Sequence, residues 1–257
     1  MAPRVTVIVP TRDRPEQLGH CLAALAAQTV DAAELEVLAV QDAEGAGPGA
    51  ARLRGAALAQ APILCFTDDD CEPDPGWAAA LEQALLAGAD AAVGRTVNAV
   101  QNNRFSQASQ LVVTHLMERQ AGYGTANNMA VRAEALREVP FDTRFRFAGG
   151  DRDWAVRLRS AGKRVAFVPD AVVRHRHDLS AADFVRQQFA YGRGAYAFRR
   201  RHAAPVRREA PSLYVSLLAR AWRAGPAMGL LVAASQVVTA AGYAVAAASD
   251  RNRRRLG

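Results

Sequence analysis

Three consecutive carboxylates, Asp68, Asp69 and Asp70, follow a short apolar run at residues 63–67 in a chain of 257 residues. The run is typical of a buried β-strand, and at its end Asp68 and Asp70 point to one side and Asp69 to the other. Adjacent like charges repel, so either water solvates all three or a positive group lies against them. Two carboxylates on one side are suitable oxygen ligands for Mg²⁺ or Mn²⁺. A solvated acidic loop that leads into a helix at Pro75 is the alternative, and this motif alone leaves both open.

Strands and helices are expected to alternate through the first part of the chain. β-Branched and apolar runs predict the strands, and leucine or alanine spacing predicts the helices between them. The expected strands are 5–9, 35–40, 63–67 and 91–94, and the expected helices are 16–28, 50–60 and 75–87. This order predicts an α/β fold with a Rossmann-like, mostly parallel mixed sheet.

Polar clusters follow three of these strands. Thr11–Arg14 follow the first, Asp42 follows the second, and Asp68–Asp70 follow the third. Ligand sites in such sheets lie at the carboxyl ends of strands. We therefore expect the three clusters to share one edge of the sheet and to form one site.

The middle of the chain is less regular. A polar helix is expected at 103–119, and GTANNMAVRAEAL predicts a loop, a short strand and the start of a helix. A further helix at 151–161 should end at Gly162. Strand residues 165–168 follow, and 171–174 lead to the sequence RHRHD.

Six segments in order resemble the inverting family-2 glycosyltransferases with the GT-A fold. They are VTVIVPTRDRPEQLGHCLAALAAQT, LEVLAVQDAEG, GPGAARLRGAALAQAPILCFTDDDCEPDPGW, GTANNMAVRAEAL, FDTRFRFAGGDRDWAVRLRSAG and VPDAVVRH. The resemblance covers roughly residues 4–178. It implies transfer of a sugar from a nucleotide-diphosphate donor to an acceptor hydroxyl, with Mg²⁺ or Mn²⁺ as the cofactor. A carboxylate would take the hydroxyl proton in one direct displacement, which inverts the anomeric carbon.

The resemblance also implies roles for individual residues. Asp70 and His175 would hold the metal, and Asp151 would be the base. Asp153 stays a second candidate, because the family's frequent Glu-Asp pair is Gly150-Asp151 here. Residues implied to contact the nucleotide sugar are Pro10, Thr11, Asp42, Arg52, Asp68 and Asp69.

Several of these residues also have a structural explanation. Asp42 could cap the approach to a helix, and Arg52 could be a solvated helix residue. Asn128 is implied to lie beside the acceptor, whereas Trp77 is either an acceptor contact or a core residue. Leu53 replaces an asparagine that the family carries, so one polar contact near the donor is missing or replaced.

The C-terminal part has a different character, which predicts a domain boundary between residues 178 and 179. Residues 180–257 carry 13 of the 32 Lys/Arg and 3 of the 25 Asp/Glu, whereas the chain has a net charge of +7. Ser180 and Asp183 predict a capping box for a helix that begins near Ala181. On this helix Arg186 and Arg193 could form a lid over the donor site, or could be solvated.

Residues 224–249 contain no charge, and arginines flank them on both sides. This pattern fits a helix on the inner leaflet of a membrane better than a clean transmembrane span. Leu231, Ala234, Val238, Ala241 and Val245 form an apolar stripe at 3-4-3-4 spacing along this helix. A membrane position would suit a lipid-linked or cell-envelope acceptor, and no nucleic-acid partner is expected. Packing on the chain's own domain or on a second subunit is the alternative.

The three cysteines, Cys21, Cys65 and Cys71, show no zinc or disulfide spacing, and the apolar run at the start of the chain is too short for a signal peptide. Both features predict a cytoplasmic protein, peripheral to the membrane if the C-terminal helix binds there. Two other functions compete. A sugar-phosphate nucleotidylyltransferase would need a Gly-rich loop after the first strand, where this chain has PTRDRPEQ. A non-catalytic GT-A domain that binds membrane or nucleic acid is the second.

Overall fold

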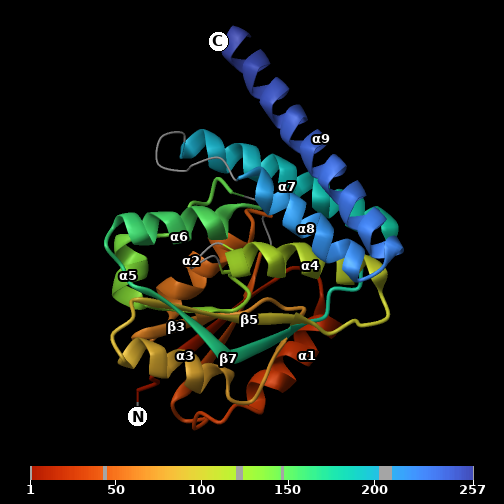
Figure 1. Cartoon of the computed structure of the whole chain (residues 1–257). Helices are drawn as coiled ribbons and strands as arrows, with labels where there is room; N and C mark the ends of the chain where they lie inside the picture. The colour runs from red at the N-terminus through yellow and green to blue at the C-terminus, as the bar shows by residue number, and fades with distance from the viewer. Residues whose placement is uncertain (1, 43–44, 120–123, 146–147, 203–209, 257) are drawn as a thin grey trace. The chain divides into compact units, whose positions relative to one another are not determined.

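The computed structural model describes residues 2–42, 45–119, 124–145, 148–202 and 210–256, with side chains described as far as residue 252 (Figure 1). The chain divides into two compact units. The first comprises Met1–Ala99, Gly122–Arg146 and Asp151–Arg176, and the second comprises Val100–Ala121, Phe147–Gly150 and His177–Gly257. The division at 176/177 lies close to the expected boundary. Residues 100–121, however, group with the C-terminal helices, which the sequence analysis did not anticipate.

The first unit is built on a seven-stranded sheet with the order β2-β1-β3-β6-β5-β7-β4. Its strands are β1 (Val5–Thr11), β2 (Leu35–Gln41), β3 (Ile63–Phe66), β4 (Cys71–Pro73), β5 (Ala91–Asn98), β6 (Met129–Arg132) and β7 (Val165–His175). Its helices are α1 (Pro15–Ala26), α2 (Pro48–Leu58), α3 (Trp77–Leu86), α5 (Ala133–Glu138) and α6 (Gly150–Ser160), of which α6 begins with the last residue of the second unit.

The predicted α/β fold with a mixed sheet is confirmed, but parallel pairings do not predominate. β1 pairs parallel with β2 and β3, and β5 pairs parallel with β7. β6 lies between β3 and β5 and runs antiparallel to both, and β4 runs antiparallel to β7. The strand at β4 was not predicted, because three residues that end in proline carry no strand periodicity.

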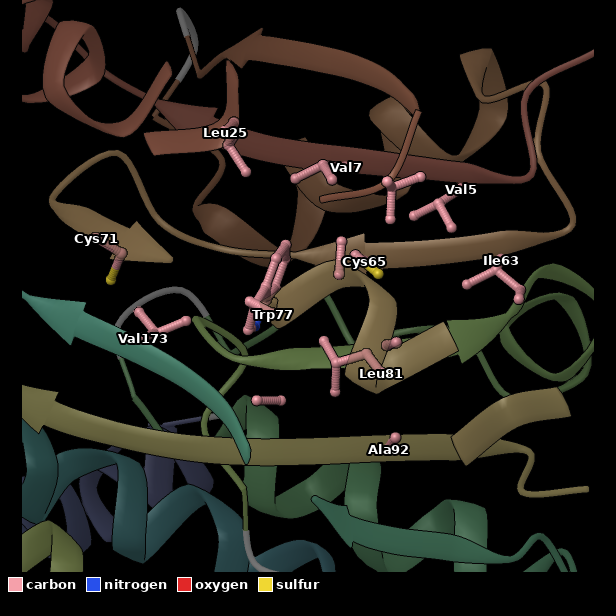
Figure 2. Close-up of a cluster of buried hydrophobic side chains, with 14 of the residues drawn as sticks. Val5, Val7, Leu25, Ile63, Cys65, Cys71, Trp77, Leu81, Ala92 and Val173 are labelled. Atoms are coloured by element: carbon pink, nitrogen blue, oxygen red, sulfur yellow. The ribbon is translucent and has the colours of Figure 1, made fainter. Parts of the chain in front are cut away.

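Opposite faces of the sheet pack into two apolar clusters. In β1, Val5, Val7 and Val9 face one cluster and Ile8 faces the other, as the alternation of a strand requires. Figure 2 shows the first cluster, where Trp77 and Leu81 of α3 pack against Val7 and Cys65 of the sheet. The three cysteines are buried free thiols.

The second unit is helical, with α4 (Arg104–Arg119), α7 (Ala181–Arg201), α8 (Pro211–Arg223) and α9 (Pro226–Leu256). The predicted capping box is present at the start of α7: Ser180 accepts from the Asp183 N–H, and the Asp183 carboxylate accepts from the Ser180 N–H. Glycines allow α7 and α9 to pack closely. A Cβ at Gly192 would lie 1.9 Å from the Thr239 carbonyl oxygen, and one at Gly242 would lie 2.1 Å from the Phe189 carbonyl oxygen.

The expected stripe on α9 agrees only in part with the structure, because Ala234, Ala241 and Val245 are exposed but its two other members are not. Leu230, Val237 and Val245 are 63%, 71% and 50% exposed, whereas Leu231 and Val238 are partly buried. Val232 and Ser235 are fully buried within the unit. The helix therefore turns Leu231 and Val238 toward its own unit, because packing on neighbouring helices, which the sequence does not reveal, sets the rotation.

We expect Gly192→Ala to lower the free energy of unfolding by about 1–3 kcal/mol, because the added methyl group meets backbone that cannot move independently. Gly19→Ala is the control, since a Cβ at Gly19 in α1 contacts nothing within 4 Å. That change should stabilise the helix by roughly 0.5–1 kcal/mol. Denaturant unfolding followed by circular dichroism measures both. Equal stabilisation by the two variants would contradict the close approach of α7 and α9.

Candidate active site

The carboxyl ends of β1, β3 and β7 lie at one edge of the sheet, since these strands run in the same direction. The antiparallel β6 contributes its amino end to the same edge. The loop after β1 is held in a defined shape, because Asp13 has a left-handed φ of 52° and Pro15 begins α1. This edge therefore collects side chains from segments far apart in the sequence.

Cations lie against all three adjacent aspartates. Arg52 Nη2 lies 2.5 Å from Asp68 Oδ1. Arg14 Nη1 lies 3.3 Å from Asp69 Oδ1 and 3.2 Å from Asp70 Oδ2. Asp69 is only 4% exposed, which excludes a fully solvated acidic loop. The repulsion between the aspartates is thus offset by positive groups.

Asp69 is the most enclosed of the three. Burial raises the pKa of its carboxyl group, while the hydrogen bond from Thr11 and the charge of Arg14 act in the opposite direction. Thr11 Oγ1 donates to Asp69 Oδ2 at 2.9 Å. Pro10 and Thr11 themselves are buried in β1, where they pair with Val40 and Gln41. This contact fixes the end of β1 to the start of the acidic segment.

Asp70 and His175 form a compact ligand group with Cys71, whose donor atoms all lie within 4.8 Å of one another. The pairing of Cys71 with His175 in β4 and β7 creates it, and His175 Nε2 lies 3.2 Å from Asp70 Oδ1. Burial acts to lower the pKa of His175, but the hydrogen bond and charge of Asp70 outweigh it and leave that pKa raised. Burial raises the pKa of the Cys71 thiol well above its usual value, so this sulfur stays protonated. One carboxylate and one imidazole are donors that a divalent ion such as Mn²⁺ accepts.

The carboxylate of Asp42 accepts hydrogen bonds from backbone N–H groups. Its two carboxylate oxygens accept from the N–H groups of Ala46 and Gly47, both at 3.0 Å. Gly47 precedes α2 with a φ of 96°, so the carboxylate shapes the turn into that helix. The structural alternative for Asp42, a cap on the approach to a helix, describes its contacts here. A contact with a base stays a prediction.

Arg52 is not a solvated helix residue. It is 4% exposed, pairs with Asp68, and its Nε atom is buried with no hydrogen-bond partner within the described part of the chain. Its charge also acts to lower the pKa of Asp151. Arg52 therefore connects the acidic segment electrostatically with the candidate base.

Asp151 and Asp153 have different surroundings, although both lie in the first turn of α6. Asp151 is partly buried, and its Oδ2 accepts from the Ala126 N–H at 3.0 Å. Burial raises its pKa, and Arg52 and the Ala126 N–H only partly offset this. Asp153 has no exposed surface, and Arg157 Nε donates to it at 2.7 Å. Of the two carboxylates, only Asp151 keeps some exposed surface.

Trp77 and Asn128 are both inside the protein. Trp77 Nε1 donates to Asn128 Oδ1 at 2.8 Å, and Asn128 Nδ2 donates to the Ala171 carbonyl at 3.0 Å. Each residue is 0% exposed. Their placement corrects the suggested acceptor contact, because these side chains satisfy one another's buried polar groups.

The two arginines suggested for a lid lie in the second unit. Arg186 is exposed and pairs with Asp183, three residues earlier on α7, at 2.5 Å. Arg193 is also exposed. A closure over the donor site stays a prediction.

One site residue was missed by the sequence analysis. Arg14 belongs to the polar cluster after β1, but it received no role. A positive charge directly before Pro15, at the strand end nearest to three carboxylates, was the signal that could have identified it.

An α/β sheet with acidic, basic and histidine side chains gathered at the carboxyl ends of its strands defines a class, the α/β enzymes that bind ligands at this edge. Two family models narrow the class: "Glycosyl transferase family group 2" matches residues 95–248, more than half of the chain, and "Glycosyl transferase family 2" matches residues 40–149. The chain belongs to glycosyltransferase family 2, and it is a glycosyltransferase. The sequence resemblance is confirmed, and the nucleotidylyltransferase alternative is wrong.

Known proteins similar to the chain agree. Glycosyltransferase AglE of Haloferax volcanii is 26% identical over 227 residues, covering 75% of this chain and 73% of AglE. The pre-mycofactocin glycosyltransferase of Mycobacterium tuberculosis is 26% identical over 230 residues, covering 77% of this chain but only 48% of that protein.

Solved structures share the fold at lower identity. The mannosyltransferase PcManGT of Pyrobaculum calidifontis, in complex with GDP-Man and Mn²⁺, has a TM-score of 0.57 at 19% identity, covering 100% of this chain and 81% of that one. S. aureus TarS 1–349 in complex with UDP has a TM-score of 0.54 at 16% identity, covering 97% and 91%.

Asp151→Asn and Asp153→Asn should affect stability differently, and only the second should lower it. A raised pKa means that ionised Asp151 costs stability at neutral pH, so Asp151→Asn should leave the free energy of unfolding unchanged or higher. Asp153→Asn removes the charge that Arg157 needs and should cost about 1–3 kcal/mol. Denaturant unfolding at pH 7 measures both. Any gain from Asp151→Asn should shrink as the pH falls through the raised pKa of folded Asp151, and it should vanish below about pH 3.9, where the aspartate is protonated in both states.

Proposed function

We propose that this chain transfers a sugar from a nucleotide-diphosphate sugar to an acceptor hydroxyl, with inversion and with Mn²⁺ or Mg²⁺ as the cofactor. The observation that carries the proposal is the gathering of Asp69, Asp70, His175 and Asp151 at one edge of the sheet. In support, a protein of the same fold was solved with GDP-Man and Mn²⁺, and another with UDP.

Asp70 and His175 are the residues that would hold the divalent ion. Their oxygen and nitrogen donors fit it, whereas the soft sulfur of Cys71 is a poor ligand for Mg²⁺ or Mn²⁺. When bound, the ion supplies positive charge against the leaving diphosphate. Asp69, which accepts a hydrogen bond from Thr11, would also accept one from a ribose hydroxyl of the nucleotide sugar. Arg52, which pairs with Asp68, would place a positive charge near the nucleotide sugar.

Asp151 would act as the general base. The Ala126 N–H orients its carboxylate, and its raised pKa brings it closer to the operating pH, where a base is more effective. It takes the proton of the acceptor hydroxyl as the oxygen attacks the anomeric carbon, and the diphosphate leaves from the opposite side. Asp153 is enclosed and paired with Arg157, which leaves Asp151 as the single candidate base. One displacement assisted by one base inverts the configuration of the anomeric carbon.

Asp70→Ala and Asp151→Asn should separate binding from chemistry. Asp70→Ala should abolish transfer and the Mn²⁺-dependent part of nucleoside-diphosphate binding. Asp151→Asn should keep that binding while turnover falls by roughly 10²-fold or more, the scale of general base catalysis. Turnover is measured as UDP, GDP or dTDP release from the matching sugar donors, and binding by calorimetry with and without Mn²⁺.

The matched control is Asp153→Asn, two residues from Asp151. If Asp153→Asn gave the loss of turnover and Asp151→Asn were mild, the assignment of the base would be wrong. Near-normal turnover of Asp70→Ala would overturn the metal site.

We also propose that the C-terminal helix contacts an anionic membrane face, where a lipid-linked or cell-envelope acceptor would be found. Within the part of the chain that the structure describes, one helix, Pro226–Asn252, is long and apolar enough to cross a membrane by length and composition. The exposed Leu230, Val237 and Val245 lie on one stripe of α9, and Arg223 and Arg251 near its ends are exposed. An apolar stripe between basic ends suits a helix in the headgroup region.

The full chain should bind vesicles that contain an anionic lipid, and high salt should release part of it, because the arginine contribution is screened. The double variant Leu230→Glu/Val237→Glu should bind at least about tenfold more weakly, since it places charge in the apolar stripe. Val185→Glu on α7 is the control, because Val185 is also an exposed valine of the second unit, at 49%. Vesicle cosedimentation measures binding. Equal binding by the double variant and the control would exclude this stripe as the contact.

A further inference from the structure

Arg14 lies where the proposed metal site needs a cation. A single guanidinium nitrogen, Nη1, lies 3.3 Å from Asp69 Oδ1 and 3.2 Å from Asp70 Oδ2. The other oxygen of Asp70 lies 3.2 Å from His175 Nε2. Both oxygens of Asp70 thus face positive or hydrogen-donating groups within the protein itself.

The backbone of Arg14 is fixed, but its side chain can leave. Asp13 in the left-handed region and Pro15 at the start of α1 set the position of the Arg14 backbone. The Arg14 side chain is 53% exposed, so the guanidinium can swing into solvent without opening the apolar core. Asp69 and Asp70, by contrast, have side chains only 6% and 13% exposed and remain in place.

A guanidinium is charged at every accessible pH, so at Asp70 Oδ2 it repels a divalent ion that approaches the same carboxylate group. We propose that Arg14 is the resident counter-ion of the free enzyme, and that the divalent ion displaces it from Asp69 and Asp70. This inference rests on the proposed metal-dependent function. Arg14 is therefore a positioning residue: it neutralises the acidic segment before substrate arrives and keeps the affinity for the ion alone low.

Two consequences separate this role from a merely structural ion pair. Removing the charge leaves Asp69 and Asp70 without their shared cation, so the metal-free protein should lose stability. The same change removes the competitor for Asp70, so the protein should bind the ion more tightly. A structural ion pair alone would give the first effect without the second.

The probe is Mn²⁺ alone, added to the full chain without nucleotide and followed by electron paramagnetic resonance of the free ion. Arg14→Gln should bind Mn²⁺ about five- to tenfold more tightly than the wild type, the scale of breaking two partly exposed ion pairs. Arg14→Lys keeps the charge and should stay within about twofold of the wild type. Arg12→Gln removes one charge from the same loop, beside Gly45, and should also stay near the wild type.

Thermal unfolding gives a second measurement on the same proteins. The Tm of Arg14→Gln should be lower than that of the wild type without metal, and Mn²⁺ should raise it by more than it raises the wild-type Tm, since a ligand stabilises the folded state according to its affinity. Wild-type Mn²⁺ binding that disappears in Asp70→Ala, together with equal or weaker binding in Arg14→Gln, would overturn only the role of Arg14. Absence of Mn²⁺ binding in both the wild type and Arg14→Gln would overturn this inference and the proposed metal dependence together.

Discussion

The electrostatic repulsion between three adjacent carboxylates is the constraint on which the site depends. Asp68, Asp69 and Asp70 leave β3 with little solvent around Asp69, so each needs a cation nearby. Arg52 from α2, Arg14 from the loop after β1 and His175 from β7 supply the partners. Each partner comes from a different element. The strand order of the sheet therefore determines which charged side chains lie around the acidic segment.

The same arrangement explains how two chemically different carboxylates arise in one protein. Asp70 is surrounded by donors and stays suited to hold a cation, whereas Asp151 sits with one backbone N–H and the more distant charge of Arg52. The antiparallel direction of β6 brings that N–H to the edge. A parallel strand at this position would have presented its other end, and α6 would have lacked this contact.

Local signals in the sequence predicted local structure well. The Ser180 capping box, the strand before Asp68 and the turn at Gly162 are each determined by residues within a few positions, so their types suffice to identify them. The direction of β6, the short β4 and the grouping of α4 with the C-terminal helices depend on partners far away in the sequence. The family resemblance named most of the candidate site residues, but it did not reveal that Trp77 and Asn128 are hydrogen-bonded to one another or that Arg14 pairs with Asp70.

The backbone hydrogen bond to Asp151 has a consequence for sequence divergence. Because the donor is the N–H of residue 126 rather than a side chain, every amino acid except proline can supply it. The segment before β6 is packed, however: Ala126 and Asn128 are 1% and 0% exposed, so burial limits which side chains it accepts. The hydrogen bond to Asp151 therefore survives any substitution at residue 126 that fits this core and keeps the backbone path, except proline.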